Sequence, residues 1–322
     1  MNSSLKNLES VLEDKESALL NTEQVAHFVA EGLLCFESLI PEKINQEFLC
    51  FAEEAQEEVN SKIPKHLPGT PFTECLRETL LESVIRHPRI QGAIFSLLGR
   101  GSVFDHHHVH ITYPKSMTAQ HNHQDSTIDP REKAFDIQIL YFPQRVTASM
   151  GGTRYIPGSH LRKVHESQIA RYQNFLGQVR VCCPSGTVMV LHHGLWHGGG
   201  RNTSDRKRYM YKLRLQPTEK QSLLWDTSDL NEERICKWRQ PIFQGSHNNQ
   251  KDPVPSILMR KQPWFDNEGR LELINRIKFW RLLLGSPEMD VDYWMSRLEQ
   301  GQSGKSPVKS PQEHSVGVRR DV

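Results

Sequence analysis

The pattern of apolar positions over the first hundred residues is that of helices. Asn21 can cap a helix over "TEQVAHFVAEG", with Gln24 at the capping-box position and Gly32 as a left-handed terminator. Pro41 suits the first turn of a second helix, whose apolar residues recur at helical spacing through Val59. The runs "LRETLLESVI" and "AIFSLLG" predict two more short helices. We expect residues 1–100 to form a helical scaffold that packs on a core.

From about Ser102 the period of the pattern changes to two, which predicts strands separated by turns. The predicted strands are "SVFDHHHVHITYP", "FDIQILYFP", "TRYIPGSH", "QVRVCC", "TVMVLHH" and "RYMYKLRLQP". Many short strands without crossover helices between them favour a β-sandwich or a jelly roll. The predicted fold class is therefore mainly β with flanking helices (α+β), with its core over residues 101–217.

The remaining segments have weaker patterns. The stretch "RKVHESQIARYQNFL" is typical of a helical insertion, and "RLELINRIKFWRLLLG" predicts a helix that ends at Gly285. Residues 218–300 are accordingly expected to form a partly helical C-terminal extension. Residues 301–322 are polar and rich in Pro and Ser, so we expect a disordered tail.

Composition narrows the function classes. The chain has 322 residues, 37% of them hydrophobic and 24% charged, which suits one large domain or two smaller ones. Its net charge of +2 does not indicate a nucleic-acid partner. No apolar run approaches the length of a bilayer span, and the N-terminus lacks a signal peptide's apolar segment, so we expect a cytoplasmic protein. The six cysteines lack CxxC spacing and are expected to be reduced thiols.

The stretch "HNHQDS" is the first candidate for metal chemistry. On an extended chain His121, His123 and Asp125 project to the same side. A His-x-Asp pair supplies two ligands of the open two-histidine, one-carboxylate iron site, and a later strand must supply the third. His197 in "WHGGGRN" is the best candidate, because it follows the apolar strand "TVMVL" and glycines beside it permit close approach.

Three motifs in order, "HQDS", "GGTRYIPGSH" and "HGGGRNTSDRKR", resemble the phytanoyl-CoA dioxygenase family of Fe(II)- and 2-oxoglutarate-dependent oxygenases. The likeness spans the chain from "TEQVAHFVAEGLLCF" to Pro217. It implies a double-stranded β-helix (jelly roll) that holds iron through His123, Asp125 and His197.

The resemblance also implies residues that bind the co-substrate. An arginine usually lies eleven residues after the second histidine, and Arg208 stands there, with Arg206 as a weaker candidate. Gln124 matches a position that can touch 2-oxoglutarate, and Thr153 lies in a segment that approaches the metal. Two positions depart from the family pattern, where tryptophan often precedes the first ligand and a hydroxyl residue lies two past the last. They hold Asn122 and Gly199 here, which can alter co-substrate contacts.

The reaction implied by the resemblance consumes O2 and 2-oxoglutarate, releases succinate and CO2, and usually hydroxylates a C–H bond of a small molecule. The sequence specifies neither that substrate nor the oligomeric state. Retention of Asp125 argues against the related halogenases, which lack this carboxylate.

Two other classes of protein remain open at this point. A metallo-hydrolase can use an H-x-H-x-D-H motif, although Ser126 stands at its sixth position. A non-catalytic jelly-roll module could keep the fold and the ligands without turnover. The second histidine cluster, "DHHHVH" from Asp105 to His110, is expected to be a strand whose alternate histidines face the barrel mouth or solvent.

Overall fold

The computed structural model describes residues 18–54, 58–59, 69–74, 80–126, 134–162, 173–238, 252–264 and 270–285. Within them the strands form two sheets, and neighbouring strands in both sheets are antiparallel. The six-stranded sheet has the order β1 (Leu33–Phe36), β7 (Thr187–His192), β4 (Ile137–Phe142), β9 (Arg208–Gln216), β3 (Val103–Thr112) and β2 (Thr70–Pro71). The three-stranded sheet has the order β6 (Val179–Arg180), β5 (Thr153–Tyr155) and β8 (His197–Gly199). The mainly β fold with flanking helices is confirmed.

The central strands are buried on both faces. Every residue of β4 is buried, and alternate side chains belong to two different apolar clusters. Ile137 and Ile139 pack toward the helices, whereas Leu140 and Phe142 pack into the cluster that includes residues near the small sheet. Two-sided burial explains why the sequence of this strand is almost continuously apolar, with Gln138 as its one polar residue.

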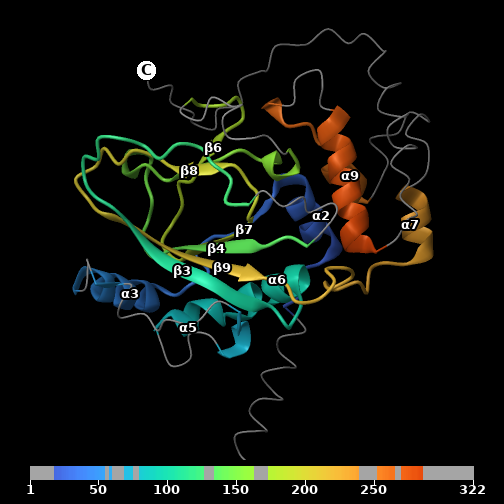
Figure 1. Cartoon of the computed structure of the whole chain (residues 1–322), viewed down its shortest axis with the longest axis horizontal. Coiled ribbons are helices and arrows are strands. Elements are labelled where there is room, and N and C mark those ends of the chain that lie inside the picture. Colours follow the sequence, from blue (N-terminus) through green and yellow to red (C-terminus); the bar gives the residue numbers. More distant parts are fainter. Residues whose placement is uncertain are drawn as a thin grey trace, which may run out of the picture.

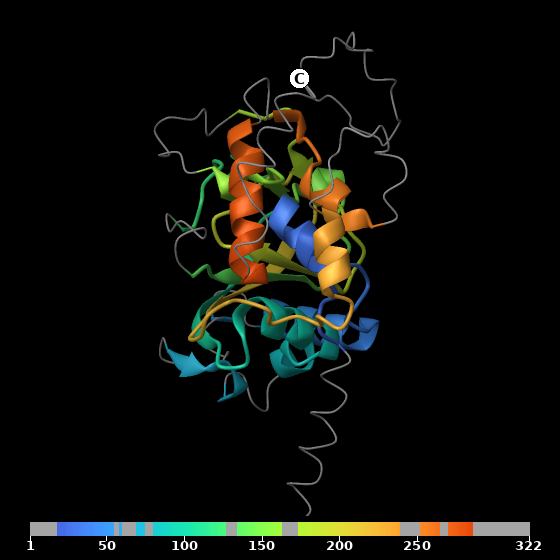
Figure 2. The same cartoon turned by 90° about the vertical axis from the view of Figure 1, so that its right-hand side faces the viewer.

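Helices cover the outer face and one end of the large sheet. They are α2 (Thr22–Glu31), α3 (Glu42–Glu54), α5 (Leu80–Ile85), α6 (Pro88–Leu98), α7 (Glu232–Trp238), α8 (Pro253–Leu258) and α9 (Arg270–Leu284). Figure 1 shows α3, α5 and α6 beneath the six-stranded sheet, with β6 and β8 above it. Helices α2 and α9 lie side by side at one end (Figure 2), where α2 also contacts α8.

The predicted helix signals are confirmed where the structure describes them. The Asn21 side chain accepts from the Gln24 N–H, and the Gln24 side chain accepts from the Asn21 N–H, which completes the capping box of α2. Gly32 ends α2 with φ 81°, and Gly285 follows α9 with φ 67°. The second helix starts one residue after Pro41, whose carbonyl accepts from the Asn45 N–H.

The expectation of helices alone over residues 1–100 was wrong in one respect, because strands β1 and β2 lie in this segment. Strand β1 pairs with β7, in the register Leu33↔Leu191 to Phe36↔Val188. A four-residue apolar run directly after a helix is too short to show a period of two, so the pattern did not reveal it. Most of "RKVHESQIARYQNFL" and all of residues 301–322 lie outside the described residues. Among those described, no helix is long and apolar enough to cross a bilayer.

Candidate metal centre and co-substrate pocket

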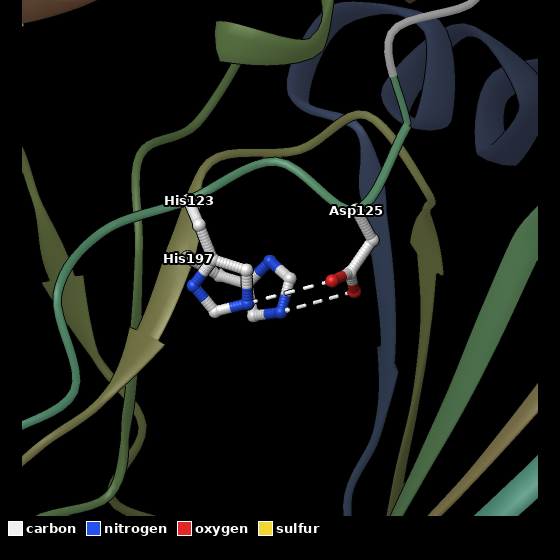
Figure 3. Close-up of side chains that lie close together, drawn as sticks. All are labelled: His123, Asp125 and His197. Carbon is white, nitrogen blue, oxygen red and sulfur yellow. Dashed lines mark ion pairs between the residues drawn. The ribbon is translucent and has the colours of Figure 1, made fainter. Parts of the chain in front are cut away.

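The three predicted ligands converge. The Nε2 atom of His123 lies 3.4 Å from Asp125 Oδ1, and the Nε2 atom of His197 lies 3.5 Å from Asp125 Oδ2. One donor atom from each residue lies within 4.8 Å of the other two, and among the described residues this is the one such cluster of histidine, cysteine and acidic side chains. Figure 3 shows both imidazoles facing the carboxylate. The separations suit three ligands of one metal ion.

Backbone pairing holds the two histidines together. The His123 N–H donates to the His197 carbonyl over 2.9 Å, and the His197 N–H donates back over 3.0 Å. This isolated bridge is the one regular pairing of the "HNHQDS" segment, and Asp125 lies in a bend. The sequence instead suggested that the segment is a strand. His197 is the first residue of β8, so the small sheet fixes its position.

Each imidazole is also oriented by a carbonyl. The Nδ1 atom of His123 lies 3.1 Å from the His121 carbonyl oxygen, and the Nδ1 atom of His197 lies 2.9 Å from that of Leu195. Because a carbonyl can only accept, each Nδ1 carries a proton, and Nε2 is the ring atom that faces Asp125 and would bind a metal.

Burial and neighbouring charges shift the pKa values of the three residues in different directions. Burial lowers the pKa of His197 to about 4, so this ring is neutral near pH 7. Burial alone would raise the pKa of Asp125, but His123, His197 and Lys212 together hold it well below its ordinary value. For His123, burial acts to lower the pKa, but hydrogen bonds to Asp125 and to the His121 carbonyl raise it overall.

A cavity of about 200 Å³ adjoins the two histidines and lies between the sheets. Strands β3, β4 and β9 supply one wall, and β5 and β8 supply the other. Its lining residues include His110, Leu140, Thr153, Arg208 and Lys212.

Arg208 is the first residue of β9 and is 5% exposed. Its Nη2 donates to Thr112 Oγ1 at 2.9 Å and its Nη1 to the Met150 carbonyl at 3.4 Å, while its Nε has no hydrogen-bond partner within the described part of the chain. No ion pair joins it to a carboxylate in those residues, and burial lowers its pKa to about 10. A buried guanidinium beside a cavity, without a carboxylate of its own, suits an anionic ligand.

A tight turn connects His197 to Arg208. The fully buried Asn202 side chain donates to the carbonyls of Thr112 and Arg206 and accepts from the Ser204 N–H and hydroxyl. These bonds explain why the "GGGRNTSDRKR" segment needs an asparagine at this position.

The other predicted site residues have different surroundings. Thr153 lines the cavity, and its hydroxyl donates to Met210 Sδ over 3.7 Å. Gln124 does not line it, because its amide donates to the Gly194 carbonyl at 2.8 Å and the Arg162 carbonyl at 3.4 Å. Arg206 is exposed and outside the cavity, which leaves Arg208 as the arginine beside the site.

Two residues beside the metal ligands were missed by the sequence analysis. Lys212 Nζ lies 2.7 Å from Asp125 Oδ2, and buried His193 places its Nε2 3.8 Å from the same oxygen. Alternation along β9 puts Arg208, Met210 and Lys212 on one face, so this pattern could have revealed the lysine. The "DHHHVH" histidines alternate as expected, with His106 and His108 exposed and His110 lining the cavity.

The donor set defines the class of site. Two imidazoles and one carboxylate, with a cavity beside them, fit an open non-haem iron centre. The buried guanidinium of Arg208, whose Nε has no hydrogen-bond partner among the described residues, fits the distal carboxylate of 2-oxoglutarate.

Comparison with known families agrees with this class. The family model described as "Phytanoyl-CoA dioxygenase (PhyH)" matches residues 28–210, more than half of the chain. The chain belongs to this family. Its cofactors are accordingly iron and 2-oxoglutarate, those of the non-haem oxygenases.

Comparisons with individual proteins are less extensive. Uncharacterized proteins of Mycobacterium bovis and Mycobacterium tuberculosis are each 35% identical over 74 residues, which cover 22% of this chain. The match spans about a quarter, 25%, of the length of these curated relatives.

Solved structures similar to this chain have low sequence identity. A structure described as the non-heme monooxygenase ThoJ is 20% identical with a TM-score of 0.48, covering 61% of this chain and 80% of that one. AviO1 from Streptomyces viridochromogenes is 16% identical with a TM-score of 0.47, covering 62% and 97%. EctD from S. alaskensis, solved with 2-oxoglutarate and 5-hydroxyectoine, is 14% identical with a TM-score of 0.46, covering 62% and 76%.

Proposed function

We propose that this chain is an Fe(II)- and 2-oxoglutarate-dependent dioxygenase that hydroxylates an unactivated C–H bond of a small molecule, with release of succinate and CO2. One observation carries the proposal: the donor atoms of His123, Asp125 and His197 meet beside a cavity that also contains the buried guanidinium of Arg208. Family membership supports the same chemistry.

In this proposal each side chain has a defined task. His123, Asp125 and His197 hold the metal ion, and the carbonyls bound to the two Nδ1–H groups keep both rings in the ligating orientation. Arg208 binds the distal carboxylate of 2-oxoglutarate, while Thr153 contributes to the wall beside it. The iron, when bound, supplies the activation of O2 and the oxidation of the C–H bond. The protein contributes orientation of the reactants and restriction of water.

The arrangement of the sheets supports a finer description of the fold. Two antiparallel sheets that face each other across a cavity are consistent with a double-stranded β-helix over residues 101–217. In this proposal residues 1–100 are a scaffold that also supplies β1 and β2, and residues 218–300 are a C-terminal extension that includes α7, α8 and α9. A cytoplasmic location stays a prediction.

Anaerobic titration tests the proposal. Adding Fe(II) and then 2-oxoglutarate to the metal-free protein is expected to produce a weak visible charge-transfer band, and exposure to O2 is expected to yield succinate. Hydrolysis of a substrate by the protein with Zn(II) as its only added metal, and without 2-oxoglutarate, would instead indicate a metallo-hydrolase. Metal and 2-oxoglutarate binding without succinate, over a broad substrate screen, would indicate a non-catalytic module.

Variants locate the activity at this cluster. His123→Ala, Asp125→Ala and His197→Ala are each expected to abolish the band and succinate formation, because each removes one of three ligands. His106→Ala is the matched control, since this histidine is exposed on β3 and outside the cavity. Full succinate formation in one of the three ligand variants would exclude that residue from the metal site.

A further inference from the structure

Lys212 is a cation in direct contact with a proposed metal ligand. Its ammonium donates to Asp125 Oδ2 over 2.7 Å, and its side chain is 13% exposed. The lysine lines the same cavity as Arg208, four residues earlier on β9. Asp125 is the single carboxylate of the described metal cluster, so a bound metal ion and this ammonium must share it.

The charges around the cavity are unbalanced. Among the described lining residues the charged side chains are Arg208 and Lys212, with Asp125 beside them as the one negative charge. A divalent metal ion would therefore enter a site whose one carboxylate among the described residues already has a cationic partner.

The next cationic side chain along β9, that of Arg214, forms its ion pairs away from the cavity. Arg214 lies two residues after Lys212, and it forms ion pairs with Asp105 and Asp136. None of these three residues lines the cavity. Arg214 therefore serves as a control for the effect of removing a cation from this face of β9.

We propose that Lys212 couples metal binding to co-substrate binding: its ammonium weakens metal binding until the two negative charges of 2-oxoglutarate offset it. The inference rests on the proposed function of this site. Like charges repel strongly in a partly buried site, where solvent screening is incomplete. The dianion would stabilise the metal ion and the ammonium together. The metal ion and 2-oxoglutarate should therefore each raise the affinity of the protein for the other.

A purely structural role for Lys212 predicts the opposite result. If the ammonium only held the Asp125 side chain in place, its removal would loosen a ligand and weaken metal binding with and without 2-oxoglutarate. The coupling role predicts tighter metal binding when the charge is removed. The sign of the change in affinity therefore separates the two roles.

The test measures Mn(II) binding to the full chain by the electron paramagnetic resonance of the free ion, with and without 2-oxoglutarate. Lys212→Met is expected to bind Mn(II) about tenfold to a hundredfold more tightly than the wild type without 2-oxoglutarate. The factor by which 2-oxoglutarate raises Mn(II) affinity is expected to fall by about tenfold or more. Lys212→Arg, which keeps the charge, and Arg214→Gln should both resemble the wild type.

The results that would contradict the coupling role differ from those that would contradict the proposed function. Weaker Mn(II) binding by Lys212→Met, or an unchanged effect of 2-oxoglutarate, would overturn the coupling role while leaving the metal site intact. A wild-type protein that binds no Mn(II), or binds it equally well as Asp125→Ala, would instead overturn the proposed function. Circular dichroism of each variant checks that the comparison is between folded proteins.

Discussion

Replacing Arg208 by alanine is the sharpest test of how this pocket binds its co-substrate. Arg208 is 5% exposed, its guanidinium donates to Thr112 Oγ1 and to the Met150 carbonyl, and its Nε–H has no partner among the described residues. A bound carboxylate would complete its hydrogen bonding. Removing one partner of a buried charge pair costs about 2 to 5 kcal/mol, which corresponds to a roughly 30-fold to several-thousandfold loss of affinity.

The assay is an anaerobic titration of 2-oxoglutarate into the Fe(II)-loaded protein, followed by the charge-transfer band. Arg208→Ala is expected to raise the dissociation constant within that range while Fe(II) still binds, because the three metal ligands are unchanged. Arg208→Lys keeps the charge but loses the planar fork, so it should fall between alanine and the wild type. Arg206→Ala is the control, since Arg206 is exposed and outside the cavity. An unchanged dissociation constant for Arg208→Ala would refute its role as the anchor.

Two further predictions concern stability. Burial lowers the pKa of His192 to about 3, so below its ordinary value of 6.5 the unfolded chain binds a proton that the folded chain excludes. The free energy of unfolding should therefore fall with decreasing pH, by up to about 1.4 kcal/mol per pH unit from this residue. Urea unfolding at pH 7.5 and at pH 5.5 measures this fall, which should be smaller for His192→Gln than for the wild type. An identical fall in the two proteins would contradict the assignment to His192. Asn21→Ala should lower the free energy of unfolding by about 1 kcal/mol, because it removes the cap of α2, whereas Asn21→Asp should keep most of the stability that the cap provides. Equal unfolding midpoints for Asn21→Ala and the wild type would show that the cap contributes nothing to stability.

Local features explain why part of the fold could be predicted from the sequence. The capping box of Asn21 and Gln24 and the terminator Gly32 act within one helix, so the bounds of α2 follow from neighbouring residues. The long strands β3 and β9 show their period over many residues. By contrast, β1 and β2 are short, and only their pairing with β7 and β3 makes them strands.

The candidate site was predictable where spacing along the chain carries the chemistry. The His-x-Asp spacing joins His123 to Asp125, the glycines after an apolar strand indicate His197, and the family resemblance implies Arg208; the structure brings all four to one region. Alternation along β9 places Lys212 on the face of Arg208, but no spacing indicates its contact with Asp125, 87 positions away, which comes from the structure.

The surroundings of Gln124 could not be predicted from its position in the motif. The resemblance implied that Gln124, next to His123, can contact 2-oxoglutarate, but Gln124 does not line the cavity beside the metal ligands. Its amide donates to the carbonyls of Gly194 and Arg162 instead. A motif position therefore predicts nearness to the metal ligands but not the direction of the side chain.

The central claim is that His123, Asp125 and His197 hold one metal ion beside the Arg208 guanidinium. A crystal structure of the protein with Mn(II) and 2-oxoglutarate, recorded with anomalous diffraction from manganese, tests it most directly. We predict one anomalous peak bonded to both Nε2 atoms and to a carboxylate oxygen of Asp125, with the distal carboxylate of 2-oxoglutarate on Arg208. A peak bonded to other residues, or 2-oxoglutarate bound away from Arg208, would contradict the account.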